Sequence, residues 1–424
     1  MIITVSNLFP RPDQPTRGMY NYQLFKEMGK VIGNKADLFG GVHANELERS
    51  DNPESRIQNV CLVPEWRIWR WRGIRRWRMS EFRIPTLYIP VFYIPFLGRS
   101  INWWFCFRGL KREVALSLNQ STIFYVPWLF PDGVAVARAI RGSGARLWLM
   151  VLGSDTFHLK SSARRQKIFE ACEQAEGIVC VAQVLADRLA AAGVPLAKLH
   201  VVPNGVDTSL FRVRSKEETP LSLMGTEPHY PGPLSQGERE YGNSRRILFI
   251  GNLVPVKGPD VMLRAFSLLC ETTQGSGNKV ISPELLIIGS GPMRRQLERK
   301  AHQLGIAERV HFLGNRSHTE VARWMNMADV LCLTSRSEGM PNVVVEALAS
   351  GLPVVATAVG ACPELLAGEP AARLCPSGDV RAIADGLMSV LDSKINRQAM
   401  ATGHAHHYSW HWQAESLLNM IGQD

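Results

Sequence analysis

Short apolar runs alternate with amphipathic segments along most of the chain. The runs are rich in Val, Ile and Leu, which predicts buried strands, and the segments between them have the periodicity of helices. The predicted strands of the first half are Ile2–Val5, Thr122–Val126, Leu147–Leu152 and Gly177–Val181. The predicted helices there are Tyr20–Lys30, Ala163–Ala175 and Gln183–Ala192. This alternation indicates parallel βαβ units and an α/β fold.

The alternation is interrupted once, between Arg214 and Arg245, by a stretch rich in Pro, Gly, Ser and Glu that has no apolar periodicity. It resumes at Arg246 and continues to about Leu391. Because 424 residues are many for one core, we predict two domains. The predicted boundaries are 1–205 for the first domain, 206–245 for a linker or insertion, 246–400 for the second domain and 401–424 for a final helical segment.

The composition is that of a folded, reduced protein. Hydrophobic residues make up 46% of the chain and charged residues 20%, which argues against disorder throughout. The eight cysteines are scattered and form no C-x-x-C pair, so neither a disulfide framework nor a zinc site is expected. No basic region precedes the apolar run Ile2–Val5, so we expect no signal peptide.

Nearly all of the net charge of +10 lies in one segment. Residues 61–112 hold eleven Arg or Lys against two Glu, and 66–78 interleave Arg with Trp. The apolar run 84–98 contains three prolines and is shorter than the roughly 20 residues of a spanning helix. Residues 66–78 and 84–104 therefore suit an anionic membrane surface. Single-stranded nucleic acid and a solvated face whose Trp residues pack inward are the alternatives.

The residues from 337 to 357 carry the strongest chemical signal. Glu338 lies in a loop, Pro341 suits a first helical turn, and Val343–Ala349 predict a helix that Gly351 ends. The free N–H groups at such a helix start attract phosphate.

A second carboxylate, Glu346, falls about one turn inside this helix, where it could accept hydrogen bonds from sugar hydroxyls. Pro353–Thr357 then predict a buried parallel strand.

This segment resembles the glutamate-x7-glutamate signature of retaining glycosyltransferase family 4, which has the GT-B architecture. Further motifs resemble the family in the same order, over roughly residues 200 to 370. They are Val201–Phe211, Ile247–Asp260, Leu285–Pro292, Val310–Gly314 and Ala328–Ser335.

The resemblance implies two Rossmann-like domains that face a central cleft. The first domain would bind the acceptor and the second the nucleotide-sugar donor. The last helix would cross back to the first domain, and Tyr408–Trp412 resembles that crossing.

For the donor, the resemblance implies that Lys257 pairs with the diphosphate, Glu338 lies near the hydroxyls of the transferred sugar and Glu346 accepts from the ribose. Asn252 stands where the family often has arginine, and it brings no charge to a phosphate. Backbone groups would help to fix sugar and phosphate; these belong to Gly339, Met340, Pro341 and Asn342.

In the first domain, Leu152–Asp155 resembles the family's His-Gly-x-Asp segment, with Leu152 in place of histidine. We therefore expect Asp155 to be catalytic and His158 to be structural. Gly18 resembles the glycine turn that packs near the diphosphate, although a plain helix-entry glycine is almost equally expected.

The resemblance implies a cytoplasmic, retaining glycosyltransferase peripheral to the membrane. It would act on a lipid-linked or polysaccharide acceptor and build a surface glycan. No Asp-x-Asp triplet occurs, so a metal-independent reaction without a cofactor is expected, and nucleic acid is not an expected partner. A GT-B epimerase or hydrolase of nucleotide sugars and a non-catalytic sugar-nucleotide binder remain alternatives.

Overall fold

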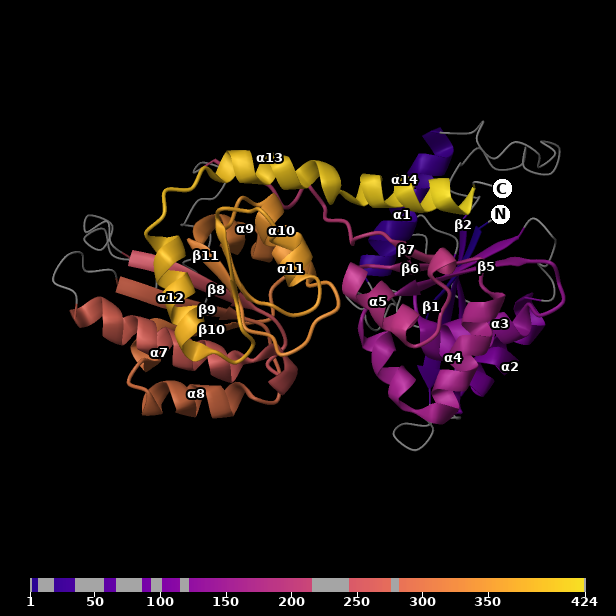
Figure 1. Cartoon of the computed structure of the whole chain (residues 1–424), viewed down its shortest axis with the longest axis horizontal. Coiled ribbons are helices and arrows are strands. Elements are labelled where there is room, and N and C mark those ends of the chain that lie inside the picture. Colours follow the sequence, from indigo (N-terminus) through magenta and orange to yellow (C-terminus); the bar gives the residue numbers. More distant parts are fainter. Residues whose placement is uncertain are drawn as a thin grey trace. The chain divides into compact units, whose positions relative to one another are not determined.

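The computed structural model of the chain describes residues 2–6, 19–34, 57–65, 86–92, 101–114, 122–215, 244–275 and 282–422. Two compact units result, one from residues 1–205 with 410–424, the other from residues 206–409. Each contains one parallel sheet with helices packed on it (Figure 1). Gly18, residues 66–78 and most of the predicted linker lie outside the described residues.

The first unit contains a seven-stranded sheet of order β3-β2-β1-β4-β5-β6-β7. Its strands are β1 (Ile2–Ser6), β2 (Ile57–Glu65), β3 (Thr86–Phe92), β4 (Ile123–Val126), β5 (Arg146–Val151), β6 (Gly177–Cys180) and β7 (Leu199–Val201). Its helices are α1 (Met19–Asn34), α2 (Asn102–Val114), α3 (Val134–Ala139), α4 (Ser162–Gln174), α5 (Gln183–Ala191) and α14 (Trp410–Ile421). Strands β1, β4 and β6 are buried along their whole length, as expected when helices cover both faces of a parallel sheet.

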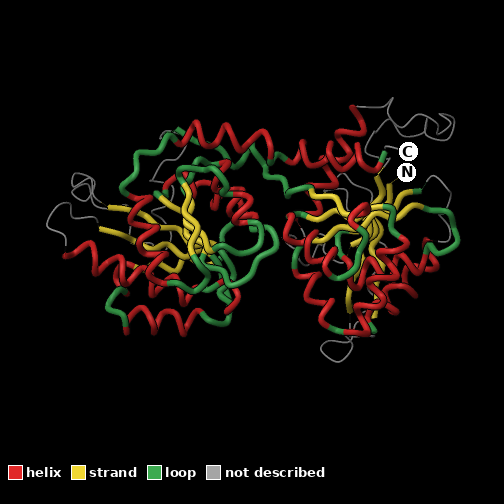
Figure 2. The backbone as a smooth tube through the Cα atoms, in the orientation of Figure 1, coloured by secondary structure: helices red, strands yellow, loops and turns green. Residues whose placement is uncertain are grey.

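The second unit contains a six-stranded sheet of order β10-β9-β8-β11-β12-β13. Its strands are β8 (Ser244–Ile250), β9 (Ser282–Ile288), β10 (Val310–Gly314), β11 (Val330–Leu333), β12 (Val354–Thr357) and β13 (Ala372–Cys375). Its helices are α7 (Pro259–Gly275), α8 (Arg294–Gln303), α9 (His318–Met327), α10 (Asn342–Ala349), α11 (Cys362–Leu365), α12 (Val380–Leu391) and α13 (Arg397–His407). Figure 2 shows the strands of each unit enclosed by helices and loops.

The order of the second sheet reverses between β8 and β11. Strands β9 and β10 follow β8 on one side, whereas β11, β12 and β13 extend on the other. In open parallel sheets, loops after the carboxyl ends of the strands form a binding crevice at such a switch point. The loops that follow β8 and β11 are therefore expected to border a binding site.

The sequence predicted β1, β4, β5, β6 and β12 to within one residue at each end, but it named no strand at β2, β3, β7 or β13 and no helix at α2 or α3. The segment 61–112 overlaps β2, β3 and α2, where only a basic and aromatic character was predicted. Pro90 lies in β3, which pairs with β2 alone and so is an edge strand, a position where proline is tolerated. Pro341 immediately precedes α10 instead of lying in its first turn.

The C-terminal tail forms two helices instead of one. A break at Tyr408 and Ser409 separates α13, which belongs to the second unit, from α14, which packs beside α1 in the first. Within the first unit, the backbone N–H of Gly205 donates to the buried side chain of Gln413 at 2.9 Å.

We expect Arg397→Met to lower the free energy of unfolding of the second unit by about 3 kcal/mol. The Arg397 guanidinium donates to the backbone carbonyls of Gly351, Met325, Asn326 and Ala328 at 2.8–3.2 Å. Methionine would leave these carbonyls without their donor. Urea unfolding of wild type and of Arg397→Met measures the loss.

The matched control is Arg381→Met, because the side chain of Arg381 is 76% exposed and makes only a 3.8 Å ion pair with Asp385. Its stability should stay within about 0.5 kcal/mol of wild type. Equal losses in the two variants would contradict a structural role for Arg397.

Candidate active site

The loop after β8 and the loop after β11 approach each other at Gly258. This glycine has a φ of +64°, and a Cβ atom placed on it would lie 2.1 Å from the carbonyl oxygen of Thr334. The Thr334 hydroxyl donates to the carbonyl of Gly258 at 2.8 Å. Only glycine permits both the backbone conformation and this close approach.

Two further loops support the same region. Gly289 lies after β9, and a Cβ atom there would be 2.0 Å from the carbonyl oxygen of Gly251. Gly360 lies after β12, and a Cβ atom there would be 2.5 Å from the carbonyl oxygen of Gly339. Gly258, Gly289 and Gly360 thus allow four loops to pack backbone against backbone at one edge of the sheet.

This packing brings Lys257 and Glu338 together. The Lys257 ammonium donates to both carboxylate oxygens of Glu338, at 2.7 and 2.8 Å. The Ser335 hydroxyl donates to Oε1 of the same carboxylate at 2.6 Å. The side chain of Glu338 is only 8% exposed, whereas that of Lys257 is 30% exposed, so the lysine lies on the solvent side of the pair.

Ser335 was not predicted as a site residue. It lies three residues before Glu338, at the end of the β11 motif, and is fully buried. Its carbonyl accepts from the hydroxyl of Thr357 at 2.6 Å, which holds the ends of β11 and β12 together. Two successive hydroxyl residues after a buried strand, Thr334 and Ser335, were the signal in the sequence.

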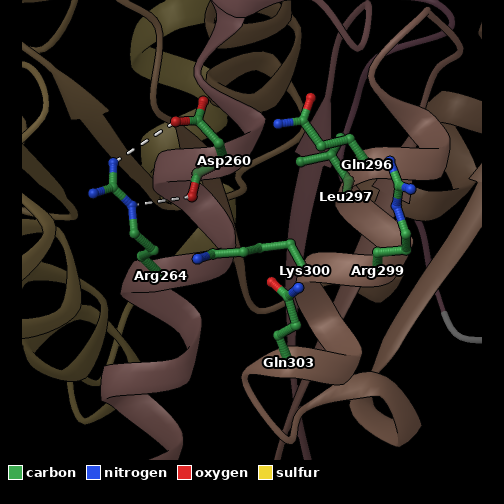
Figure 3. A pocket seen from close by; sticks show the side chains of 7 residues that line it. All are labelled: Asp260, Arg264, Gln296, Leu297, Arg299, Lys300 and Gln303. Carbon is green, nitrogen blue, oxygen red and sulfur yellow. Dashed lines mark hydrogen bonds and ion pairs between the residues drawn. The ribbon is translucent and has the colours of Figure 1, made fainter.

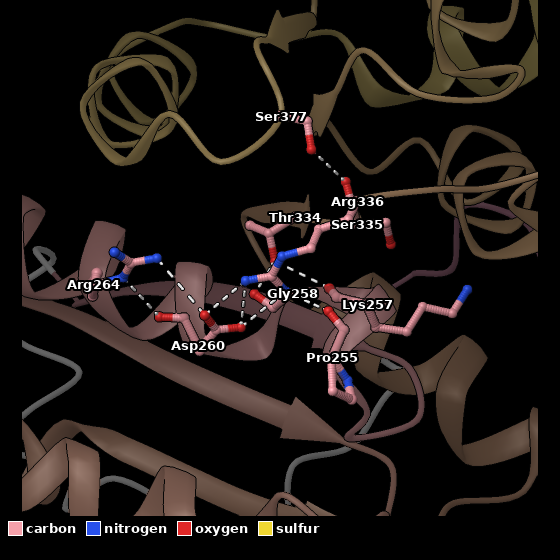
Figure 4. Close-up of polar contacts among 9 residues, drawn as sticks. All are labelled: Pro255, Lys257, Gly258, Asp260, Arg264, Thr334, Ser335, Arg336 and Ser377. Carbon is pink, nitrogen blue, oxygen red and sulfur yellow. Dashed lines mark hydrogen bonds and ion pairs between the residues drawn. The ribbon is translucent and has the colours of Figure 1, made fainter.

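Arg336, the residue after Ser335, binds the loop after β8 and the first turn of α7 (Figure 4). Its guanidinium donates to the carboxylate of Asp260 at 2.8 Å and to the carbonyl of Pro255, and its backbone N–H donates to Val256 at 2.8 Å. Burial raises the pKa of Asp260, but the hydrogen bonds and charge of Arg336 outweigh it and leave that pKa below its ordinary value. Arg336 therefore fixes the turn that carries Lys257.

Glu346 stands apart from the pair. It lies on α10, half-buried, and its carboxylate makes no hydrogen bond or ion pair with any other residue that the structure describes. Burial alone raises its pKa from 4.5 to about 7. A ligand that donates hydroxyl hydrogens to this carboxylate would stabilise its charged form.

The other predicted donor residues lie in the loop after β8 and at the start of α10. Asn252 is exposed in the loop after β8, while Met340 and Pro341 are buried before the start of α10. Gly339 is half-buried and accepts a hydrogen bond from the N–H of Ala361 at 2.9 Å. Asn342 is the exposed first residue of α10.

Asp155 belongs to the first unit and is fully buried. Its two oxygens accept from the backbone N–H groups of Leu129 at 3.0 Å and Leu152 at 2.8 Å, which ties the loops after β4 and β5 together. Burial raises its pKa to about 6 against the lowering effect of these N–H groups. Asp155 positions these two loops, and its catalytic role stays a prediction.

His158 packs 5.3 Å from the ring of Phe130, and its Nδ1 lies 3.2 Å from the guanidinium of Arg164. These contacts are typical of a structural histidine. Within the described residues, no group of three or more His, Cys, Asp or Glu side chains is arranged to hold a metal ion.

Comparison with solved structures identifies the architecture. HepE of Anabaena, solved with UDP, superposes over 100% of both chains with a TM-score of 0.69 and 16% identity. At this identity the likeness shows the fold alone, which is that of the GT-B glycosyltransferases. The prediction of a GT-B fold built from two Rossmann-like units is thereby confirmed.

Sequence comparison identifies the family. Residues 65–210 match the model described as glycosyltransferase family 4, and residues 234–406 match the model described as glycosyl transferases group 1. The two models match successive parts of the chain, and the resemblance to glycosyltransferase family 4 that its motifs indicated is confirmed.

Curated relatives resemble part of the chain. The D-inositol 3-phosphate glycosyltransferase of Actinosynnema mirum is 32% identical over 59% of this chain and 58% of its own length. The GDP-mannose-dependent alpha-(1-6)-phosphatidylinositol monomannoside mannosyltransferase of Mycobacterium tuberculosis is 26% identical over 57% of this chain and 59% of its own length. The chain thus spans less than two thirds of the relatives that it matches.

The raised pKa of Glu346 predicts a pH-dependent stability. The pKa of Glu346 is higher in the folded than in the unfolded protein, so the folded protein loses stability as the pH rises from about 4.5 to about 7. Glu346→Gln cannot ionise, so its free energy of unfolding should rise relative to wild type by about 1–3 kcal/mol over this range. Urea unfolding at a series of pH values measures the difference.

The control for this experiment is Asp392→Asn, which removes an exposed carboxylate from the same unit. Its difference from wild type should stay constant with pH. A Glu346→Gln profile parallel to that of wild type would show that Glu346 is not perturbed.

Proposed function

We propose that this protein is a retaining glycosyltransferase that moves a sugar from a nucleotide-diphosphate sugar to a lipid-linked or polysaccharide acceptor at the cytoplasmic surface of the membrane. The observation that carries the proposal is the pair of Lys257 and Glu338 at the switch point of the second sheet. A family-4 chain needs a cation for the diphosphate and an acceptor for sugar hydroxyls at this place, and the pair supplies both.

Lys257 would stabilise the leaving diphosphate. Transfer breaks the bond between the anomeric carbon and a phosphate oxygen, so negative charge grows on the diphosphate, where a fixed cation lowers the barrier. The ammonium is the more exposed partner of the ion pair and can turn toward an anion. Glu338 would then keep the hydrogen bond from Ser335 and gain hydroxyl donors from the sugar.

Glu346 and the start of α10 would hold the rest of the donor. The half-buried carboxylate of Glu346, which has no partner among the described residues, suits the two hydroxyls of a ribose, whose hydrogen bonds would favour its charged form. The first N–H groups of α10 have no acceptor within the helix and favour a phosphate. Asn342 opens that helix after the Gly339–Pro341 loop.

The reaction would retain the anomeric configuration and use neither metal nor cofactor. No Asp-x-Asp triplet occurs in the sequence, and Lys257 supplies a positive charge without a metal ion. In a front-side reaction the leaving phosphate oxygen would take the proton of the acceptor hydroxyl. Neither glutamate then has to act as a general acid or base.

The relatives suggest where to begin with donor and acceptor. A solved neighbour holds UDP, and one relative is named for GDP-mannose, so both nucleotides are candidates. The two relatives are named for inositol phosphate and phosphatidylinositol mannoside acceptors. The second of these favours an acceptor at a membrane.

Three exposed apolar side chains of the first unit favour contact with a membrane surface. Ile101 is 50%, Trp104 42% and Phe157 51% exposed. The guanidinium of Arg108 lies 5.0 Å from the Trp104 ring and the ammonium of Lys160 5.6 Å from the Phe157 ring. Such pairs suit the boundary between lipid and anionic headgroups. No helix among the described residues is long and apolar enough to cross a membrane.

We expect Lys257→Ala to lower kcat/KM for sugar transfer by about a hundredfold or more, because the developing diphosphate charge loses its cation. A panel that begins with UDP-glucose and GDP-mannose is first tested for thermal stabilisation of wild type and then for transfer to a membrane extract. Lys394→Ala removes an exposed lysine of the same unit and should behave as wild type.

If no nucleotide sugar stabilises wild type more than Lys257→Ala, the donor-site assignment fails. Donor consumption without an acceptor would identify a hydrolase or epimerase instead. Binding without any turnover would identify a non-catalytic sugar-nucleotide binder.

For membrane binding, we expect replacement of Arg70, Arg72, Arg75 and Arg76 by Glu to release the protein from vesicles that contain anionic lipid, because attraction to the surface becomes repulsion. Co-sedimentation measures the bound fraction. The control makes the same charge change at four exposed positions outside this segment: Arg188, Arg295, Arg381 and Lys394. Unchanged sedimentation of the first variant would rule out this membrane surface.

A further inference from the structure

A pocket of about 580 Å³ lies on the second unit between α7 and α8 (Figure 3). Asp260 and Arg264 line it from α7. The lining residues from α8 are Gln296, Leu297, Arg299, Lys300 and Gln303. Its volume falls within the range of small-molecule sites. None of these residues belongs to the Lys257–Glu338 pair or to the start of α10.

The charge of this pocket is positive and largely uncompensated. The structure places three cations around it, Arg264, Arg299 and Lys300, against the single carboxylate of Asp260. That carboxylate is already engaged by Arg336, which donates to it at 2.8 and 3.1 Å, and Arg264 lies 3.7 Å from it. The pocket therefore presents more positive charge than Asp260 can neutralise.

Two of the cations are available to a ligand. Within the part of the chain that the structure describes, neither Arg299 nor Lys300 forms a hydrogen bond or ion pair through its side chain. Figure 3 shows the Lys300 side chain extending from α8 toward Arg264 on α7. Lys300 of α8 and Arg264 of α7 thus approach one space, where like charges repel unless an anion separates them.

The remaining lining residues restrict the ligand further. Gln296 and Gln303 each provide one amide donor group and one acceptor, which suits hydroxyl groups. Leu297 is the one apolar side chain among the described lining residues, and no aromatic ring is available to stack on a nucleobase. The lining favours a polar ligand that carries phosphate and hydroxyl groups.

We propose that this pocket is a second ligand site, separate from the donor site, which binds the phosphate and hydroxyl groups of a phosphorylated sugar or polyol. Lys300 and Arg264 contact one phosphate from opposite helices, Arg299 adds charge at the rim, and the two glutamines bind hydroxyls. The same chemistry is found in free sugar phosphates and in the headgroup of a phosphorylated lipid.

The test measures binding of fructose 1,6-bisphosphate to the full chain by calorimetry, in wild type and in Arg299→Gln/Lys300→Gln. Each hydrogen bond between charged groups contributes enough that losing two cations should weaken binding at this site at least about tenfold. Lys257→Ala, which changes the donor site, should retain this binding. If the bisphosphate bound only at the donor site, Lys257→Ala would lose binding and Arg299→Gln/Lys300→Gln would keep it, and that result would overturn the proposal.

The matched control is Arg295→Gln/Lys394→Gln, which removes one arginine and one lysine from exposed positions of the same unit outside the pocket. It should bind as wild type does. An equal loss in both double variants would show that net charge, and not the pocket, attracts the anion, and would overturn the proposal.

A parallel arm uses vesicles with and without a phosphatidylinositol phosphate. If Arg299→Gln/Lys300→Gln weakens vesicle binding and its control does not, the phosphate comes from a lipid headgroup. If only bisphosphate binding is weakened, the ligand is a soluble sugar phosphate. If neither probe distinguishes the variant from its control, the pocket is not a phosphate site.

Discussion

The contact on which the candidate site depends is the approach of Gly258 to Thr334. It brings the loop after β8 against the loop after β11, at the one place where the order of the second sheet reverses. Lys257 immediately precedes Gly258, and Glu338 follows Thr334 by four residues, so the ion pair between them is a consequence of this backbone packing. A side chain at position 258 would separate the loops and, with them, the two charges.

The electrostatics of the candidate site depend on three charged groups, Lys257, Glu338 and Glu346, of which only the first two form an ion pair with each other. Glu338 is nearly enclosed, and removing such a carboxylate from water is costly unless it is paired, which Lys257 and Ser335 accomplish. Glu346 has no such partner in the part of the chain that the structure describes, and burial raises its pKa to about 7. A donor that brings both a diphosphate and hydroxyl groups complements all three groups at once, because it gives the lysine an anion and each carboxylate a hydrogen-bond donor.

Much of this arrangement could be predicted from the sequence, because the relevant signals are local. The glycines, the apolar runs and the helix from Asn342 to Ala349 are each encoded within a few residues, and parallel strands place their carboxyl ends at one edge. Burial and side-chain partners depend on distant residues, which is why the support from Ser335 and the enclosure of Asp155 between two loops were missed. The basic and aromatic composition before Arg112 likewise concealed two strands and a helix.

Arg336 links the two charged regions of the second unit. It neutralises Asp260 at the edge of the α7–α8 pocket and, through the carbonyl of Pro255, braces the turn that carries Lys257. Its neighbour Ser335 donates to Glu338, so a continuous set of bonded residues extends from the outer pocket to the ion pair. Because Asp260 is shared between Arg336 and Arg264, it leaves Arg299 and Lys300 of α8 without a balancing charge among the described residues. The interaction of Arg336 with Asp260, which stabilises the turn that carries Lys257, therefore leaves the pocket between α7 and α8 positively charged.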